Sequence, residues 1–262
     1  MNLKLALKSI LYPLYEQRIF RNLDFEQTPH HIGVILDGNR RWSKANPSID
    51  GDTSSARGHK VGASKIVNLL DWSEETKVKV VTLWLLSNQN LHRPADELAP
   101  LLKIISETIQ ELVARRRWEI RPVGSLELLP TDLQETLKQA AITTKGTPGV
   151  VVNVAIGYGG RSEIADAVKS LILDKSEAGL SPTEIAAAIS VDEISKHLYT
   201  AGLPDPDLVI RTSGEQRLGG FLLWQSAHSE FYFCEAYWPD FRRVDFLRAL
   251  RAYSERHRRH GI

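Results

Sequence analysis

Cysteine and methionine are almost absent from this sequence. Its 262 residues include one of each, and the cysteine is Cys234. A lone cysteine excludes an internal disulfide and a cysteine-based zinc site, and it fits a reducing compartment. Charge of one sign is lacking as well, because 33 basic and 32 acidic side chains leave a formal net charge of +1. This balance creates no global field for nucleic acid, so we expect no nucleic-acid partner.

Long apolar runs are missing too. No stretch approaches the roughly eighteen residues that a membrane span needs, and the first residues lack the uncharged core and cleavage site of a signal peptide. We therefore expect a cytoplasmic protein. Residues 1–25 predict an N-terminal helical segment with leucines on one side, until Pro13 disturbs the pattern. We expect this segment to dock on its own domain, with weak membrane-surface association as the alternative.

The rest of the chain alternates between strand and helix patterns. Continuous apolar runs, typical of strands covered on both faces, predict strands at residues 32–36, 78–86, 119–123, 150–156, 208–211 and 221–225. Helical spacing predicts helices at residues 57–76, from 95 to about 117, and at 131–143, 161–176, 182–189 and 244–257. This pattern predicts an α/β fold: residues 26–262 as one domain, with a central, mainly parallel six-stranded sheet flanked by helices. Function is then expected at the carboxyl ends of the strands.

The first predicted strand runs into a polar motif, which reads His31-Ile-Gly-Val-Ile-Leu-Asp37-Gly38-Asn39-Arg40-Arg41-Trp42. A carboxylate can hold Mg²⁺, a glycine lets the backbone turn tightly, and guanidinium groups bind phosphate oxygens. The motif therefore indicates a diphosphate and metal site, although its spacing fits a turn with solvated charges equally well. The adjoining loop, residues 43–57, fits either a lid over this site or an ordinary surface loop.

Other polar clusters follow later strands. They are Ser87 to Pro94, Asp205 to Arg217, Trp224 to Glu230, and a basic tail from Arg256 to Gly261. Each has a plain structural explanation, since Ser87 and Asn90 suit helix caps and the tail suits a solvated helix end. Neither common nucleotide motif is complete. The P-loop ending is absent after Gly38, and Ser162 stands where a dinucleotide fingerprint needs its last glycine.

Taken together, these motifs resemble the cis-prenyltransferase family, the Z-type polyprenyl diphosphate synthases that include undecaprenyl diphosphate synthase. The resemblance runs through His31 to Trp42, Gly58-His59-Lys60 with Gly62, Ser87 to Pro94, Asn153 to Arg161, Asp207 to Arg217, and Phe221 to Glu230 followed by Trp238-Pro-Asp-Phe. It implies a homodimer in which the sheet and helices enclose a hydrophobic tunnel. It also implies Mg²⁺ as cofactor and condensation of isopentenyl diphosphate with an allylic diphosphate in cis configuration, with release of diphosphate.

The resemblance further implies a role for each matching residue. Asp37 is the essential catalytic carboxylate and a magnesium ligand, and Glu230 is a second metal-associated carboxylate. The allylic diphosphate is held by Gly38, Asn39, Arg40, Arg41, Trp42, His59 and Arg93. Isopentenyl diphosphate is held by Arg211 and Arg217 with Gly219, and by Arg259 and Gly261 of a terminal Arg-x-Gly motif that reaches the partner's site. Asn90, a catalytic residue, and Ser87 lie near the reacting carbons; the proton acceptor stays unassigned.

Several positions depart from the family pattern. Ser55 replaces a common arginine, Gln89 and Leu91 alter a usual Ser-x-Glu-Asn-Trp sequence, and Gly219 replaces a common serine. Leu85 stands where long-chain enzymes tend to have a small tunnel residue. Leu85 and Leu91 resemble the short-chain actinobacterial type, which makes (2Z,6E)-farnesyl diphosphate from geranyl diphosphate. Because a packed wall leaves a growing chain no slack, we expect Leu85 to stop elongation early; an ordinary core role is the alternative.

Other functions fit less well. A trans-type prenyl synthase would need aspartate-rich motifs on an all-helical fold, and a nucleotide binder would need a complete P-loop. Within the resembling family, a medium- or long-chain synthase and a non-catalytic partner subunit are the alternatives. A partner subunit is expected to lack the carboxylate or the terminal motif, and this sequence has both Asp37 and Arg259 to Gly261.

Overall fold

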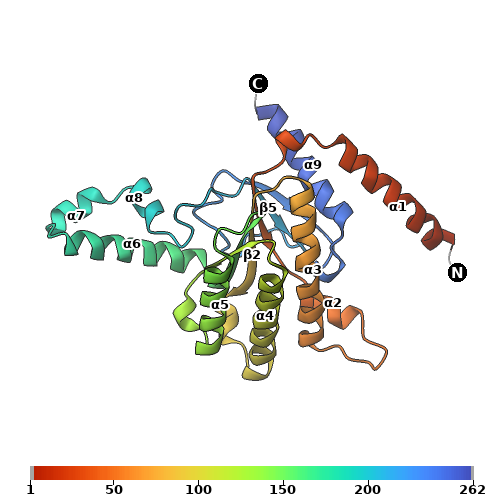
Figure 1. The fold of residues 1–262 in the computed structure, drawn as a ribbon, viewed down its shortest axis with the longest axis horizontal. Coiled ribbons are helices and arrows are strands. Elements are labelled where there is room, and N and C mark those ends of the chain that lie inside the picture. The colour runs from red at the N-terminus through yellow and green to blue at the C-terminus, as the bar shows by residue number, and fades with distance from the viewer. Residues whose placement is uncertain (1–2, 261–262) are drawn as a thin grey trace.

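In the part of the chain that the structure describes, six parallel strands form a central sheet in the order β3-β4-β2-β1-β5-β6 (Figure 1). The computed structural model describes residues 3–260, and the side chains of residues 12–256. The strands are β1 (His31–Ile35), β2 (Val80–Ser87), β3 (Glu119–Val123), β4 (Val151–Tyr158), β5 (Leu208–Arg211) and β6 (Glu230–Phe233). The predicted α/β fold with a six-stranded parallel sheet is thus confirmed.

The strand order changes direction beside β1. The chain passes from β1 to β2, β3 and β4 on one side, and then returns to β5 on the other side. Ile35, the last residue of β1, pairs with Arg211, the last residue of β5. A crevice at the carboxyl ends of strands, where the order reverses, is where open parallel sheets bind ligands. The fold therefore brings Asp37 and Arg211 to such a crevice.

Helices connect and cover the strands. They are α1 (Leu3–Asn22), α2 (Asn39–Ala45), α3 (Ser55–Glu75), α4 (Ala95–Arg115), α5 (Thr131–Thr144), α6 (Gly160–Glu177), α7 (Pro182–Ala188), α8 (Val191–Lys196) and α9 (Arg243–His260). The long predicted helices are confirmed with small shifts of their ends, whereas α2 and α8 are too short for periodicity to reveal. In Figure 1, α3, α4 and α5 stand side by side, and α6 to α8 extend from the sheet as an arm.

Helix α4 illustrates how the sequence specifies these elements. It follows Pro94 and has Asp96 and Glu97 in its first turn, where negative charge complements the positive helix end. Its buried residues, Leu101, Ile105, Thr108, Ile109 and Leu112, are mostly apolar and lie along one side of the helix. This arrangement gives the helix one buried stripe, as the sequence predicts.

The prediction for the sixth strand is wrong. Residues 221–225 form turns, with Leu222 in the left-handed region at φ 46°, and the strand is β6. Phe221 and Leu222 are fully buried because they pack in a second core cluster with Tyr158, beside the sheet. β6 joins the sheet through Glu230, whose backbone N–H donates to Asp207 O at 2.8 Å. An apolar run cannot distinguish burial in a loop from burial in a strand.

The described part of α1 docks on α9, as expected. Ile19 is buried, and Glu16 pairs with Arg243 of α9 at 2.8 Å. Arg242 lies over the Tyr12 ring, 4.8 Å from its centroid. The helix continues through Pro13, and the side chains of the leucines before it lie outside the described residues. Among the helices that the structure describes, none is long and apolar enough to cross a membrane.

Candidate active site

A cavity of about 880 Å³ opens at the carboxyl edge of the sheet. Its polar lining comes mainly from the loops that follow β1, β2 and β5, and its apolar lining from α3, α4 and β2. Among the side chains that the structure describes, six cationic ones line it, namely Arg40, Arg41, Lys44, Arg93, Arg211 and Arg217. The carboxylates that line it within the same part of the chain are Asp37, Glu97 and Glu215. The excess of positive charge next to an apolar wall suits an anionic ligand that carries a hydrocarbon chain.

Asp37 lies between two arginines at the reversal point of the sheet. Its Oδ2 accepts a hydrogen bond from Arg211 Nη2 at 2.7 Å, and its Oδ1 lies 3.3 Å from Arg41 Nη2. Burial raises the pKa of Asp37, but the hydrogen bond and charge of Arg211, with help from Ser213 and Arg41, leave that pKa below its ordinary value. The carboxylate is therefore ionised at neutral pH.

Gly38 starts α2 in a conformation that other residues rarely adopt. Its φ is +103°, and a Cβ atom there would lie 2.7 Å from Cδ1 of Tyr237. Gly38 has no side chain with which to cap the helix, and the structure shows no side-chain cap there among the described residues. Asn39 is held by a hydrogen bond from its Nδ2 to Leu36 O at 2.9 Å.

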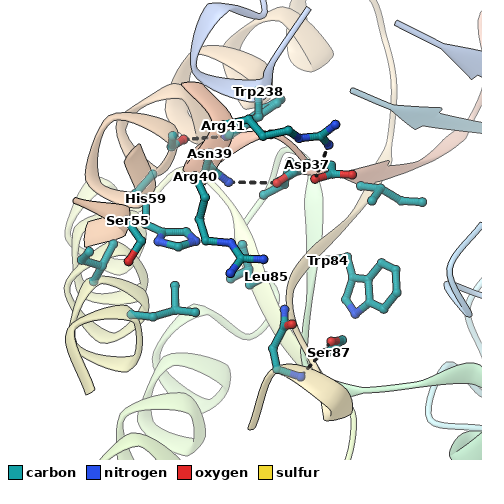
Figure 2. A pocket seen from close by; sticks show the side chains of 18 of the residues that line it. Asp37, Asn39, Arg40, Arg41, Ser55, His59, Trp84, Leu85, Ser87 and Trp238 are labelled. Carbon is teal, nitrogen blue, oxygen red and sulfur yellow. Dashed lines mark hydrogen bonds and ion pairs between the residues drawn. The ribbon is translucent and has the colours of Figure 1, made fainter. Parts of the chain in front are cut away.

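A first basic group lies across the cavity from Trp84, where Figure 2 shows Arg40 beside His59. Burial, together with the charge of Arg93, lowers the pKa of His59 to about 4, so this imidazole is neutral at pH 7. Arg93 Nη1 is buried without a hydrogen-bond partner among the described residues. Because an unpaired buried guanidinium nitrogen is costly, this group fits an anion as its partner. Arg40 lies 3.6 Å from Glu97.

Arg211 and Arg217 form a basic group on the other side of Asp37. Arg211 is 7% exposed and donates from Nη1 to the backbone oxygen of Arg217. Its Nε is buried and has no partner among the described residues. The Arg217 side chain is 69% exposed and lies 2.6 Å from Glu215. Arginine nitrogens on both sides of Asp37 are therefore free to hold two anionic groups.

Most residues that the sequence singled out converge on this cavity. Its lining includes Asp37, Gly38, Asn39, Arg40, Arg41, His59, Leu85, Ser87, Asn90, Arg93, Arg211, Arg217 and Gly219, and also the variant positions Ser55 and Gln89. Ser87 additionally caps the turn Asn88–His92, since its Oγ accepts from Asn90 N at 3.2 Å. The capping explanation for Ser87 is thus confirmed, and its role near the reacting carbons stays a prediction.

Four predicted site residues either lie outside the cavity lining or fall outside the described residues. Trp42 lies outside the lining, where its Nε1 donates to Asp240 Oδ1 at 2.8 Å. Glu230 begins β6 and pairs with Leu208, the first residue of β5. Within its own chain, Glu230 therefore lies at the amino edge of the sheet, opposite the edge that carries Asp37. There it lies 2.7 Å from Arg256 of α9. Arg259 belongs to the end of α9, but its side chain and all of Gly261 lie outside the described residues.

Sequence reasoning missed much of the apolar wall and one aromatic residue. The wall includes Ile66 of α3 and Leu101, Ile104 and Ile105 of α4. The apolar stripe of α4 was visible in the sequence, but periodicity does not reveal which part of a stripe faces a cavity. Trp84 of β2 also lines the cavity, stacked on Phe221 at 5.2 Å between ring centroids. Its position in an apolar strand made it look like ordinary core.

This fold and cavity define an enzyme for anionic substrates with apolar chains, in which two basic groups flank one ionised carboxylate. The family model described as "Putative undecaprenyl diphosphate synthase" matches residues 35–261. The chain therefore belongs to this family of prenyltransferases, as the sequence motifs indicated.

Individual relatives agree with the family assignment. "Isoprenyl transferase 1" of Streptomyces avermitilis is 57% identical over 261 residues and matches 100% of both chains. "(2Z,6E)-farnesyl diphosphate synthase" of Thermobifida fusca is 56% identical over 96% of this chain and 97% of its own. Lavandulyl diphosphate synthase from Lavandula x intermedia, solved in complex with dimethylallyl diphosphate, has a TM-score of 0.78 and 32% identity, covering 87% of this chain and 96% of that one.

Proposed function

We propose that the protein condenses isopentenyl diphosphate with geranyl diphosphate in cis configuration, giving (2Z,6E)-farnesyl diphosphate and releasing diphosphate. The observation that carries this proposal is that two basic groups flank Asp37 and adjoin an apolar wall within one cavity. The 56% identity with a relative named for this product supports the short chain. A medium- or long-chain synthase is the second candidate, because the same polar groups would serve any primer length.

The first basic group suits the allylic primer. Arg40 and Arg93 with the neutral His59 would hold its diphosphate, together with Arg41 and the start of α2. When the allylic carbon–oxygen bond breaks, negative charge develops on the leaving diphosphate, and fixed guanidinium groups stabilise it. The apolar wall excludes water from the cation-like allylic fragment. Trp42 lies outside the cavity lining and would act indirectly. Arg57 lies over its ring, 4.8 Å from the centroid, and this contact would stabilise the adjoining loop of residues 43–57.

The second basic group suits isopentenyl diphosphate. Arg211 and Arg217 would bind its phosphates, and Gly219 lies close to them, since a Cβ there would be 3.6 Å from Arg211 Nη1. The double bond of this substrate then attacks the allylic carbon, and a proton leaves as the new double bond forms. Asn90 and Ser87 line the space between the strand β2 and α4, where they would position the reacting carbons.

Asp37 fits a magnesium ion as cofactor. It is an ionised oxygen ligand at the cavity surface, and two arginine contacts leave part of its acceptor capacity free. Among the residues that the structure describes, no group of three or more metal-binding side chains occurs. This fits Mg²⁺, which is usually held by one or two carboxylates plus substrate phosphates. When bound, the ion would neutralise charge on the leaving diphosphate.

We further propose a cytoplasmic homodimer with residues 26–262 as its catalytic domain. Arg259 and Gly261 would reach the isopentenyl diphosphate site of the partner. Glu230 lies beside α9, the helix that carries Arg259, so it would support that terminal motif. Within a single chain, we therefore propose Asp37 as the protein ligand for Mg²⁺. The docking of α1 on α9 favours a structural role for residues 1–25 over weak membrane-surface association.

A primer series tests the proposed function. The purified protein is incubated with labelled isopentenyl diphosphate, Mg²⁺ and dimethylallyl, geranyl or farnesyl diphosphate, and products are separated by chain length. We expect one addition to geranyl diphosphate and loss of the reaction when EDTA removes the metal. Long products would favour the second candidate. Absence of incorporation with every primer would point to a non-catalytic partner subunit.

A further inference from the structure

Glu215 lies between two arginines that belong to different basic groups of the cavity. Its Oε1 accepts from Arg41 Nη1 at 3.1 Å, and its Oε2 lies 2.6 Å from Arg217 Nη1. Glu215 follows Gly214, which has a φ of +74°, in the loop after β5. The carboxylate lines the cavity and its side chain is 26% exposed. The proposed reaction itself gives Glu215 no role.

The contacts of Glu215 close a ring of polar links around the cavity mouth. In order, the ring joins Asp37, Arg41, Glu215, Arg217 and Arg211, and it returns to Asp37. Four links are ion pairs, and the fifth is the hydrogen bond from Arg211 to the backbone oxygen of Arg217. Each arginine in such a ring already has the orientation that it would otherwise have to adopt when a diphosphate binds. The entropy cost of ordering its side chain is therefore met before binding.

The two arginines depend on Glu215 to different degrees. Arg41 is also held by Asp37 and by Ser213 Oγ at 2.7 Å, and it lies over the Tyr237 ring. The exposed Arg217 side chain pairs with no other carboxylate among the described residues. Loss of the Glu215 carboxylate would thus release Arg217 more than Arg41.

We infer that Glu215 is a positioning residue that fixes Arg41 and Arg217 relative to each other and so sets the spacing between the two diphosphates. This inference rests on the function proposed above, because it assigns one arginine to each diphosphate. The energetic argument is that a flexible arginine must be ordered before it can bind a phosphate, and Glu215 orders it in advance.

Positioning and simple electrostatics predict opposite effects of removing the Glu215 charge. A carboxylate near an anion repels it, so electrostatics alone predicts that Glu215→Gln lowers the KM for both substrates. Positioning predicts a rise, because a glutamine amide offers one acceptor oxygen and a donor that cannot pair with an arginine. The sign of the change in KM therefore separates the two explanations.

The experiment is steady-state kinetics of Glu215→Gln with isopentenyl and geranyl diphosphates varied in turn. We expect the KM for isopentenyl diphosphate to rise about tenfold and that for geranyl diphosphate about threefold, as loss of charge-assisted hydrogen bonds allows. The matched control is Glu97→Gln, since Glu97 forms an ion pair with Arg40 at 3.6 Å and with no other arginine or lysine among the described residues. It is expected to change only the KM for geranyl diphosphate. An unchanged or lowered KM for isopentenyl diphosphate in Glu215→Gln overturns the inference.

A double substitution tests whether Glu215 acts through Arg217. In an Arg217→Ala background, Glu215→Gln should add little to the KM for isopentenyl diphosphate, because the residue it positions is gone. Full additivity, or recovery of the KM at raised Mg²⁺, would show a direct role and overturn the inference. Calorimetry of each diphosphate with the wild type and with Glu215→Gln distinguishes failure of the proposed function from failure of the inference. If neither diphosphate binds, the proposed function fails; if both bind equally well to Glu215→Gln, only the inference fails.

Discussion

Asp37 combines two tasks at the scale of a single residue. It holds Arg211 and Arg41 in place, and its remaining acceptor capacity faces the cavity. The same arginines keep its pKa low after burial has raised it. The residue is therefore both part of the polar framework and the proposed ligand for the metal, and a test must separate these tasks.

Asp37→Asn is expected to lower kcat by about a hundredfold or more, the usual scale for losing a preorganised electrostatic group. The amide oxygen still accepts from Arg211, so the variant should fold with a melting temperature near that of the wild type. Steady-state kinetics and a thermal melt measure both effects. Asp132→Asn, on the exposed first turn of α5, is the matched control and should leave kcat unchanged. Full activity in Asp37→Asn would refute the proposed role.

Leu85 is the residue that we expect to limit product length. It lines the cavity from β2, while its neighbour Leu86 is buried in the core at 1% exposure and does not belong to the lining. Leu85→Ala should extend the product beyond farnesyl diphosphate, because the wall recedes by several atoms. Leu86→Ala should cost about 2–5 kcal/mol of stability and leave product length unchanged. Chromatography of labelled products is the measurement, and an unchanged product from Leu85→Ala would mean that Leu85 is ordinary core.

At the scale of elements, the amino ends of the strands are tied by a buried polar chain. His31 Nδ1 lies 2.7 Å from Pro204 O, so this nitrogen donates, and Nε2 accepts from Thr82 Oγ1 at 2.8 Å. Asn153 Nδ2 in turn donates to Thr82 Oγ1 at 2.9 Å. The chain links β4, β2, β1 and the loop before β5. It uses both nitrogens of a neutral imidazole, and burial lowers the pKa of His31 to about 4.

This depressed pKa predicts lower stability in acid. At pH values between the ordinary pKa of 6.5 and about 4, His31 is protonated in the unfolded chain but stays neutral in the folded chain. The free energy of unfolding therefore falls as pH falls through this window, by on the order of 2 kcal/mol between about pH 7 and about pH 5 from His31. Urea denaturation at both pH values measures the loss. His31→Gln should be less stable at pH 7 and lose less on acidification; an equal loss would contradict the assignment.

For the whole molecule, the central question is whether each active site uses two chains. If Arg259 serves the partner's site, a heterodimer of an Asp37→Ala chain and an Arg259→Ala chain keeps one intact site, because both substitutions fall in the other site. Dimers purified through two different tags should show about half of the wild-type activity. Each homodimeric variant is the control and should be nearly inactive. An inactive heterodimer would mean that Arg259 serves its own chain.

Light scattering of the wild type provides the companion measurement. A monomeric mass at assay concentration would contradict the proposed homodimer independently of the kinetics.

The sequence predicts the features of this protein that arise from patterns within a single helix or strand, but not those that arise from packing between distant segments. Continuous apolar runs and helical stripes specify the α/β fold, since each pattern follows from the geometry of one element. The motif at Asp37 specifies a polar group at a strand end for the same reason. The sixth strand was misplaced because Phe221 and Leu222 are buried by packing under Tyr158, which no local pattern records.

What the sequence by itself determined was the family, the sheet, and the residue types that bind diphosphate. Only the tertiary structure decided which of them meet. Register in the sheet brings Arg211 beside Asp37 and sends Glu230 to the opposite edge. The folding of distant loops places Glu215 between Arg41 and Arg217. The physical reason is that strand pairing and loop closure join residues far apart in the chain, while periodicity reports only on neighbours.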